Sequence, residues 1–449
     1  MGSQRRVLVI AEAANPEWVS VPLVGWNIAN TLRAVVDVHL VTQVRNREAI
    51  LRAGLIEGRD FTAIDTETVM RPLWSLISLL RGGANKGWSI ATAMQSLFYP
   101  LFERAVWRGF GKRIQSGEFD VVHRVTPLSM TAPSLLARHC ARARVPFVVG
   151  PLNGGVPWPK GFEKQRRDEG ERLSFLRPLY KLVPGIRATW RNASAIIVAS
   201  RTAASELPAD AMRKAVFIPE NAVDPRRFEA SSDAARYDCL NLCFIGRLVP
   251  CKGLEIALDA SQDLLRARRA RFTIIGDGPL MAALRKQADR LHVSDSVEFT
   301  GWLEHSVVAS IASKSSIFLF PSIREFGGGA VIEAMALGLV PIVVNYGGPG
   351  EIVTDETGFR LALGSPQSIT ANAAALLADI AEGRHDLAAI AKRGLERVNG
   401  LYTWEKKALQ LSEVYDWVCG DRADRPQFPF FDGGLQSPPS RSSNSLVAQ

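Results

Sequence analysis

The residues best suited to chemistry lie in the segment 320–350, FPSIREFGGGAVIEAMALGLVPIVVNYGGPG. A strand is expected to end at 320–322, and the three glycines at 327–329 open a short helix that runs to about Leu337. Glycines at a helix start leave backbone N–H groups accessible to a ligand, and the helix dipole favours negative charge there. The segment therefore predicts a cradle for an anion or for sugar hydroxyls.

Two carboxylates, Glu325 and Glu333, flank the start of this helix, eight positions apart. On a regular helix this spacing corresponds to about 12 Å, which is longer than the separation of roughly 5–9.5 Å between the paired carboxylates of glycoside hydrolases. It suits side chains that hold two ends of one extended ligand. Two Glu residues near a helix more often form a solvated face, but Glu333 lies between the apolar Ile332 and Ala334, which favours a function.

Two cations follow a second strand in the segment 244–260, FIGRLVPCKGLEIALDA. The strand is expected to end at Gly246, and Arg247 and Lys252 precede a helix that begins at Gly253. Arg offers a fork of donors and Lys a mobile point charge, so the two can neutralise a diphosphate. The alternative is a pair of exposed loop cations.

A third strand, in IIGDGP at 274–279, runs into a turn at Gly276 with room for a flat base, although such turns are common. The run VVHRVTP places His123 at an expected strand end, where it could face a ligand; a single His is more often structural. Five cysteines are odd in number and scattered, which predicts reduced thiols in a cytosolic protein without a metal site. They are Cys140, Cys239, Cys243, Cys251 and Cys419.

The elements that position these residues read as alternating strands and helices. Buried-strand candidates in the first half are 7–10, 36–42, 120–123, 146–150, 195–199 and 215–218. In the second half they are 240–248, 270–278, 296–302, 316–322, 340–345 and 358–362. This pattern predicts the α/β class, with two doubly wound Rossmann-like domains that face a cleft at the carboxyl ends of their strands.

Turn residues in NAVDPRRFEASSDAARY place the domain boundary near residue 221. We expect an N-terminal domain at 1–220 and a C-terminal domain at 221–402. A helix at 403–420 is expected to close the ordered part. The Pro/Ser/Gly-rich residues 421–449 are expected to be a disordered tail.

The distribution of charge along the chain indicates which kind of partner the protein could bind. The chain carries a net charge of +9, and residues 1–240 hold 33 Lys and Arg against 22 Asp and Glu, a net +11. Signatures of nucleic-acid binding are missing, and no apolar run is long enough for a signal peptide or a membrane span. The aromatic and basic stretch 88–114 reads either as an interfacial helix or as a core helix with solvated Arg residues, and the basic stretch 160–191 is a second candidate docking surface. An anionic membrane surface is the expected partner of this charge.

The three segments, in this order, resemble the retaining nucleotide-sugar glycosyltransferases of the GT-B fold, family 4. This resemblance implies that the N-terminal domain binds the acceptor and that the C-terminal domain binds the nucleotide sugar. The run GPLNGGVPW at 150–158, with Asn153 expected at the mouth of the cleft, resembles the cell-surface polysaccharide transferases of this group. The resemblance covers most of 221–418, including NAVDPRRF and GGPGEIV. It implies that the C-terminal helix at 403–420 returns to the N-terminal domain. It implies a donor diphosphate held by Arg247 and Lys252 and ribose hydroxyls held by Glu333. It also implies a donor-sugar contact from His123 across the cleft. The remaining donor-binding residues implied are Gly246, Gly276, Glu325, Phe326, Gly327 and Gly328.

The implied reaction is a metal-independent transfer, with retention, from a nucleotide-diphosphate sugar to a hydroxyl of a glycan or glycolipid acceptor, without a further cofactor. The implied location is the cytoplasm, with peripheral contact to the inner face of the plasma membrane. The first half matches less well, because a Gly-Gly loop common in the family is replaced by AEAANPEWVSVPLVGW with Gly25 alone. Two alternatives stay open: a sugar-nucleotide epimerase of similar fold, and a non-catalytic nucleotide-sugar-binding protein of a membrane assembly complex.

Overall fold

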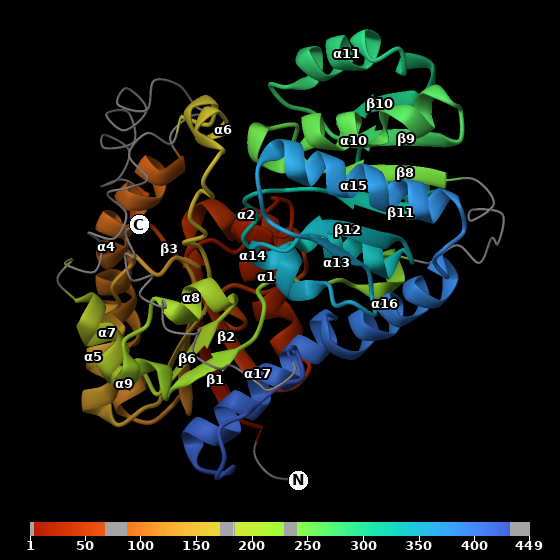
Figure 1. The fold of residues 1–449 in the computed structure, drawn as a ribbon. Helices are drawn as coiled ribbons and strands as arrows, with labels where there is room; N and C mark the ends of the chain where they lie inside the picture. Colours follow the sequence, from red (N-terminus) through yellow and green to blue (C-terminus); the bar gives the residue numbers. More distant parts are fainter. Residues whose placement is uncertain (1–3, 68–87, 171–182, 184, 229–239, 432–449) are drawn as a thin grey trace, which may run out of the picture.

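The structure is a computed structural model that describes residues 4–67, 88–170, 183, 185–228 and 240–431, with only the backbone at 88–98 and 305–306. It contains two parallel sheets, each covered by helices (Figure 1). The strands of the first sheet end at Phe217 and those of the second begin at Leu240. The predicted fold class, two doubly wound α/β domains, is confirmed.

The N-terminal domain is built on a seven-stranded sheet in the order β3-β2-β1-β4-β5-β6-β7. Each strand pairs in parallel with its neighbours, as the intervening helices require. The strands are β1 (Arg6–Ala11), β2 (Asp37–Gln43), β3 (Phe61–Ile64), β4 (Val121–Thr126), β5 (Phe147–Leu152), β6 (Ala195–Val198) and β7 (Ala215–Phe217). The helices are α1 (Val21–Leu32), α2 (Arg47–Arg52), α4 (Trp88–Gln115), α5 (Leu135–Ala143), α6 (Glu163–Asp168), α7 (Ile186–Asn192), α8 (Arg201–Ser205) and α9 (Ala209–Met212).

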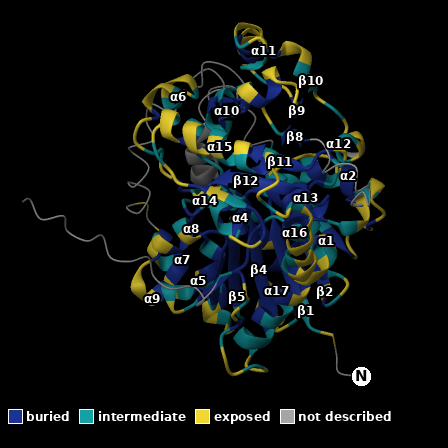
Figure 2. Ribbon diagram, turned by 45° about the vertical axis from the view of Figure 1, so that its right-hand side comes forward, coloured by how far each residue is buried: buried dark blue, intermediate teal, exposed yellow. Residues whose placement is uncertain are grey.

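The C-terminal domain repeats this plan with a six-stranded parallel sheet in the order β10-β9-β8-β11-β12-β13. Its strands are β8 (Leu240–Ile245), β9 (Ala270–Ile275), β10 (Val297–Gly301), β11 (Ile317–Phe320), β12 (Val340–Val344) and β13 (Phe359–Leu361). Its helices are α10 (Leu254–Arg266), α11 (Met281–Arg290), α12 (His305–Ala312), α13 (Gly329–Ala336), α14 (Gly347–Ile352), α15 (Pro366–Ala381) and α16 (Leu387–Leu401). The central strands are buried on both faces, which explains why they read as continuous apolar runs (Figure 2).

The last helix, α17 (Trp404–Cys419), follows the C-terminal domain in sequence but packs against α1 of the N-terminal domain (Figure 1). Its apolar face, with Leu411, Val414 and Tyr415, joins the core beneath β1 and β2. The helix begins one residue after Thr403, whose side chain accepts a hydrogen bond from the backbone N–H of Lys406.

The prediction of a disordered tail from residue 421 is wrong for residues 421–431. Phe430 is 2% exposed and packs edge-on against Phe217 and Tyr402, one from each domain. Arg397 donates a hydrogen bond to the Phe430 carbonyl at 2.7 Å, and Arg201 lies 3.8 Å from the ring centroid of Phe431. Composition alone misses this segment because its aromatic residues are bracketed by Pro, Gly and Asp. Residues 432–449 lie outside the described chain.

The stretch 88–114 lies within α4, and from Tyr99 onward its apolar side chains face the N-terminal core. These inward side chains are Tyr99, Phe102, Val106, Phe110 and Ile114. Arg104, Arg108 and Lys112 are exposed on the opposite face. For this part of the helix the structure selects the core reading with a basic outer face. No helix in the described ranges is long and apolar enough to cross a membrane.

Candidate functional site

The turns after three neighbouring strands of the C-terminal domain, β8, β9 and β11, carry most of the residues predicted for a ligand. Gly246 follows β8 and Gly276 follows β9, with φ angles of 148° and 137°. A Cβ on Gly276 would lie 1.9 Å from the carbonyl oxygen of Gly246, so the two backbones touch. Both glycines therefore have a structural reason to be present, beside any contact with a donor.

The two predicted cations stand in different surroundings. Arg247 is exposed after β8, whereas Lys252 ends a short 3-10 turn (Pro250–Lys252) and keeps only 19% of its side chain exposed. Lys252 forms an ion pair with Glu325, and its ammonium lies 5.1 Å from the ring centroid of Phe320. Burial favours the neutral amine, but the Glu325 carboxylate outweighs it and raises the pKa of Lys252. Lys252 is therefore a charged ammonium held at the ends of β8 and β11.

Gly253 brings the turn after β8 against the turn after β11. It has a φ angle of 72°, and a Cβ at this position would lie 2.2 Å from the carbonyl oxygen of Pro321. Only glycine fits such a contact with this backbone conformation. The Lys252–Glu325 pair thus rests on a close backbone approach, which fixes the cation beside the carboxylate.

The helix expected after the glycines is α13, which begins at Gly329, ends at Ala336 and is followed by Gly338 with a φ angle of 71°. Glu325 precedes this helix and Glu333 lies on it with a partly exposed side chain. The helical estimate of 12 Å between them therefore does not apply. The backbone N–H of Gly348, in α14, donates a hydrogen bond to the Glu325 carbonyl at 3.0 Å and holds the loop in place.

Glu220, which the sequence reading missed, packs directly against this loop. It is 7% exposed, accepts a hydrogen bond from the Asn153 side chain, and its Oε1 would lie 2.1 Å from a Cβ on Gly327. Burial raises the pKa of Glu220 to about 7, although the Asn153 amide and the Lys407 ammonium favour the carboxylate. The available signal was an acidic residue two positions after the buried run 215–218 and directly before the predicted domain boundary at 221.

Two further ionisable groups interact electrostatically with Glu220. Lys407 of α17 is 2% exposed and donates a hydrogen bond to the Pro219 carbonyl; burial lowers its pKa to about 7. Glu351 of α14, which is partly exposed, accepts the backbone N–H of Arg201 at 3.0 and 3.1 Å, at the start of α8, and partial burial raises its pKa to about 7. These groups tie α17 and α14 to the N-terminal domain.

The loop after β5 supplies a second set of contacts between the domains. The Nε of Arg324 donates a hydrogen bond to the Val156 carbonyl at 3.1 Å. The Arg324 guanidinium lies 5.1 Å from the ring centroids of both Trp158 and Phe326. The hydroxyl of Tyr346 donates to the Pro157 carbonyl at 2.8 Å. The predicted donor residue Phe326 thus lies at the boundary between the domains.

His123 is the predicted site residue that the structure does not bring to this cluster. Strand β4 continues to Thr126, so the expected position at a strand end is wrong. His123 is fully buried, with Nδ1 2.7 Å from the Tyr415 hydroxyl and Nε2 2.7 Å from the Gly150 carbonyl. Burial lowers its pKa to about 4. With both ring nitrogens engaged inside the core, His123 cannot contact a ligand in this arrangement.

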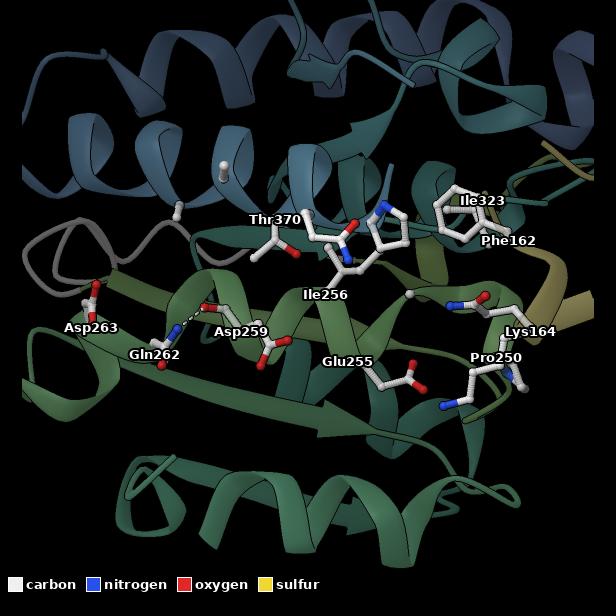
Figure 3. A pocket seen from close by; sticks show the side chains of 16 residues that line it. Phe162, Lys164, Pro250, Glu255, Ile256, Asp259, Gln262, Asp263, Ile323 and Thr370 are labelled. Carbon is white, nitrogen blue, oxygen red and sulfur yellow. Dashed lines mark hydrogen bonds between the residues drawn. The ribbon is translucent and has the colours of Figure 1, made fainter. Parts of the chain in front are cut away.

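A cavity of about 480 Å³ lies between the domains, behind the turn that carries Lys252 (Figure 3). Phe162 and Lys164 line it from the N-terminal side, and α10 and α15 line it from the other. It includes Pro250 and Gly253 but none of Arg247, Lys252 or Glu325, so it is distinct from the predicted site. Across the described ranges, no cluster of three or more His, Cys, Asp or Glu residues is arranged to hold a metal ion.

The C-terminal half of the chain is similar in sequence to a known protein family. The family model "Glycosyl transferases group 1" matches residues 234–394. A phosphatidylinositol N-acetylglucosaminyltransferase subunit from Arabidopsis thaliana is 30% identical over 215 residues, which are 46% of this chain and 46% of that protein. The chain spans about half the length of the first curated relatives it matches. Its C-terminal half is therefore similar to the glycosyl transferases group 1 domains.

Solved structures extend the likeness to both domains. Sucrose-phosphate synthase from Thermosynechococcus elongatus superposes with a TM-score of 0.59 at 19% identity, covering 93% of this chain and 100% of that one. Anabaena HepE in complex with UDP gives a TM-score of 0.58 at 15% identity, covering 91% and 98%. At these identities the likeness shows the fold alone, and the fold is of the GT-B type.

Proposed function

We propose that the protein is a glycosyltransferase that moves a sugar from a nucleotide-diphosphate sugar to a hydroxyl group of an acceptor. The observation that carries this proposal is the Lys252–Glu325 ion pair inside the region similar to glycosyl transferases group 1 domains, at the adjoining ends of β8 and β11. The pair places Lys252, a cation that can bind phosphate, next to Glu325, a carboxylate that can accept hydrogen bonds from sugar hydroxyls. Arg247, exposed beside them, offers a second cation to the same diphosphate.

The proposed reaction is metal-independent and retains the configuration at the anomeric carbon. Arg247 and Lys252 stabilise the negative charge that grows on the leaving diphosphate, which is the task a metal ion performs elsewhere. The bond from the anomeric carbon to the phosphate oxygen breaks while the bond to the acceptor oxygen forms on the same face. The acceptor proton passes to the departing phosphate oxygen. Because Glu325 is paired with Lys252, we assign it to holding the sugar rather than to nucleophilic attack.

The acceptor is proposed to be a lipid-linked or cell-surface glycan intermediate, reached from an anionic membrane surface. Helices α4, α5 and α7 pack side by side. Their sequences from Tyr99 onward contain one acidic residue, Glu103, which is fully buried. Their exposed basic side chains are Arg104, Arg108, Lys112, Arg138, Arg142, Arg187 and Arg191. Each basic side chain near an anionic lipid surface contributes about 1 kcal/mol, so this face suits phospholipid headgroups.

Vesicle binding tests the membrane part of the proposal. We expect sedimentation with vesicles containing phosphatidylglycerol, loss of binding at high salt, and no binding to phosphatidylcholine alone. A triple variant, Arg104→Glu, Arg108→Glu and Arg138→Glu, should abolish binding. A matched variant on the other domain, Lys286→Glu with Arg290→Glu on α11, should bind normally. Salt-insensitive binding, or binding by the triple variant, would contradict an electrostatic contact through this face.

The activity is tested by incubating the purified chain with UDP-, GDP-, ADP- and TDP-sugars and measuring which one raises the melting temperature. The stabilising donor is then offered with lipid-linked acceptors, with and without a chelator, and the product linkage is read by NMR. Transfer that survives chelation and gives a retained linkage supports the proposal. Donor binding without transfer would favour the non-catalytic alternative.

The epimerase alternative would require an acid and a base at the ligand. The candidate offered by the sequence was His123, and its burial in the core removes that candidate. Conversion of a nucleotide sugar to its epimer without an acceptor would nevertheless restore this alternative.

A further inference from the structure

The donor-sugar loop, defined here as residues 324–328, is contacted by the N-terminal domain as well as by its own domain. Within the C-terminal domain it is held by Lys252 and by the Gly348 N–H group. From the other side it meets the residues that follow β5, 153–158, which we call the β5 loop. Residues of both domains, far apart in the sequence, therefore contact the donor-sugar loop.

The strongest of these contacts joins Arg324 to the β5 loop. The guanidinium lies 5.1 Å from the ring centroids of both Trp158 and Phe326, and Nε donates to the Val156 carbonyl at 3.1 Å. An Arg side chain that contacts two aromatic rings and is fixed by a hydrogen bond has little freedom left. Because Arg324 is the direct neighbour of Glu325, its fixed position constrains the backbone that carries the carboxylate.

Two further contacts link the same segments. The Tyr346 hydroxyl donates to the Pro157 carbonyl at 2.8 Å, directly before α14, whose Gly348 holds the Glu325 carbonyl. At the other end of the β5 loop, Asn153 donates to Glu220, which packs against Gly327. The β5 loop thus reaches the donor-sugar loop at Arg324, at the support of Glu325 and at Gly327.

We propose that Trp158 and Arg324 are positioning residues that set the place of the Glu325 carboxylate when the two domains meet. This inference rests on the proposed function and adds a role for the N-terminal domain in donor geometry. Neither residue is assigned to binding the diphosphate. Their loss should slow the transfer step while nucleoside diphosphate affinity, set by Arg247 and Lys252, stays nearly unchanged.

Five variants test the role: Trp158→Leu, Trp158→Phe, Arg324→Met, Arg324→Lys and the double variant of Trp158→Leu with Arg324→Met. We expect Trp158→Leu and Arg324→Met each to lower kcat at least about tenfold, with the Kd of the nucleoside diphosphate within threefold of wild type by calorimetry. The double variant should be no slower than the slower single variant, because both remove the same contact. Trp158→Phe, which keeps an aromatic face, should recover kcat to within threefold.

Matched controls remove an exposed residue of the same type. Trp302→Leu, at a side chain 63% exposed, and Arg271→Met, at an exposed position of β9, should leave kcat unchanged. If Trp158→Leu lowers the melting temperature severely, the Arg324→Met and Arg324→Lys pair carries the test, because Arg324 is replaced without opening an aromatic cavity. Single variants within twofold of wild type, or a double variant that equals the product of the singles, would overturn the role.

The contact is also measured without turnover. Small-angle X-ray scattering with the nucleoside diphosphate present should give a larger radius of gyration for Arg324→Met than for wild type, and equal values would overturn the contact. Absence of transfer by the wild-type chain would instead contradict the proposed function. Normal wild-type transfer with unaffected variants overturns the positioning role alone.

Discussion

The ion pair of Lys252 and Glu325 and the imidazole of His123 occupy comparable sheets in the two domains, but they differ in their access to a ligand. The pair lies beyond the ends of β8 and β11, where each side chain keeps about a fifth of its surface exposed. His123 lies inside β4, fully buried, and both of its nitrogens serve the packing of α17 and β5. A polar residue two or three positions inside a parallel strand is part of the core, whereas one just beyond the strand can bind.

The largest effect should come from Lys252→Ala, which removes one of the two cations for the leaving diphosphate. We expect kcat to fall by about 100- to 1000-fold, as for loss of one donor to a developing negative charge. Initial rates with the stabilising nucleotide sugar give the value. Lys286→Ala, on the exposed face of α11, is the matched control. Near-normal turnover by Lys252→Ala with an unchanged melting temperature would break the assignment of the diphosphate cation.

A smaller loss is expected from Glu325→Gln, which keeps the shape of the side chain but removes its charge. Hydrogen bonds to a carboxylate are stronger than those to an amide, so we expect kcat to fall by about 10- to 100-fold. Steady-state kinetics on both substrates measure this, with Glu396→Gln, exposed on α16, as control. A variant with wild-type kcat would show that Glu325 only neutralises the charge of Lys252 and does not hold the sugar.

His123→Gln sharpens the contrast from the other side, because its effect should fall on stability. The pKa of His123 is about 4 in the folded protein against 6.5 ordinarily, so the unfolded chain binds more protons between these values. Stability is therefore present above pH 6.5 and is lost as the pH falls through this window. The variant should reduce that loss by about 3 kcal/mol, measured by urea unfolding from pH 4 to 7.

The control for this titration is His292→Asn, at an exposed position with a φ angle of 57° that Asn tolerates. This variant should leave the loss of unfolding free energy between pH 7 and pH 4 unchanged. We expect His123→Gln to keep kcat within about threefold of wild type for the folded fraction. A collapse of kcat with unchanged stability would return His123 to the catalytic machinery.

An effect of opposite sign is expected from Glu220→Gln. The pKa of Glu220 is raised to about 7 from 4.5, so the folded protein binds more protons in this window and its stability falls as the pH rises. Removing the carboxyl should flatten this limb by up to about 3 kcal/mol. Glu351, whose pKa is also raised to about 7, keeps part of the slope. An unchanged limb in the same urea titration would show that Glu220 does not titrate there.

The sequence predicted where the candidate donor-binding residues of the C-terminal domain lie relative to its strands and helices, because those positions depend on local rules. A strand, a glycine turn and a helix start lie within 20 residues of one another in each segment, so hydrophobic runs and glycines suffice to place Lys252 and Gly327. The same rules misplaced His123, because an Arg inside β4 was read as the end of the strand. Arg124 is in fact fully buried and donates to the Ala132 carbonyl.

The individual side-chain contacts between the domains escaped sequence reasoning for a different reason, although the return of the last helix and the place of 150–158 at the cleft were expected. Arg324 and Val156 are 168 positions apart, and nothing local in either segment indicates that they meet. Glu220 is an ordinary acidic residue at a turn until Asn153 and Gly327 are brought to it. The aromatic residues at 428–431 likewise gain partners only once Phe217 and Tyr402, from two domains, lie side by side. Such positions depend on how two finished domains fit.

The return of α17 to the first domain has a consequence for the order in which the chain can fold during synthesis. Leu411, Val414 and Tyr415 complete the apolar layer against β1 and β2, and Tyr415 is also the partner of His123. These residues leave the ribosome after the whole C-terminal domain has been made. The first domain to be synthesised is therefore the last to be completed, and until then it exposes an apolar surface that chaperones recognise.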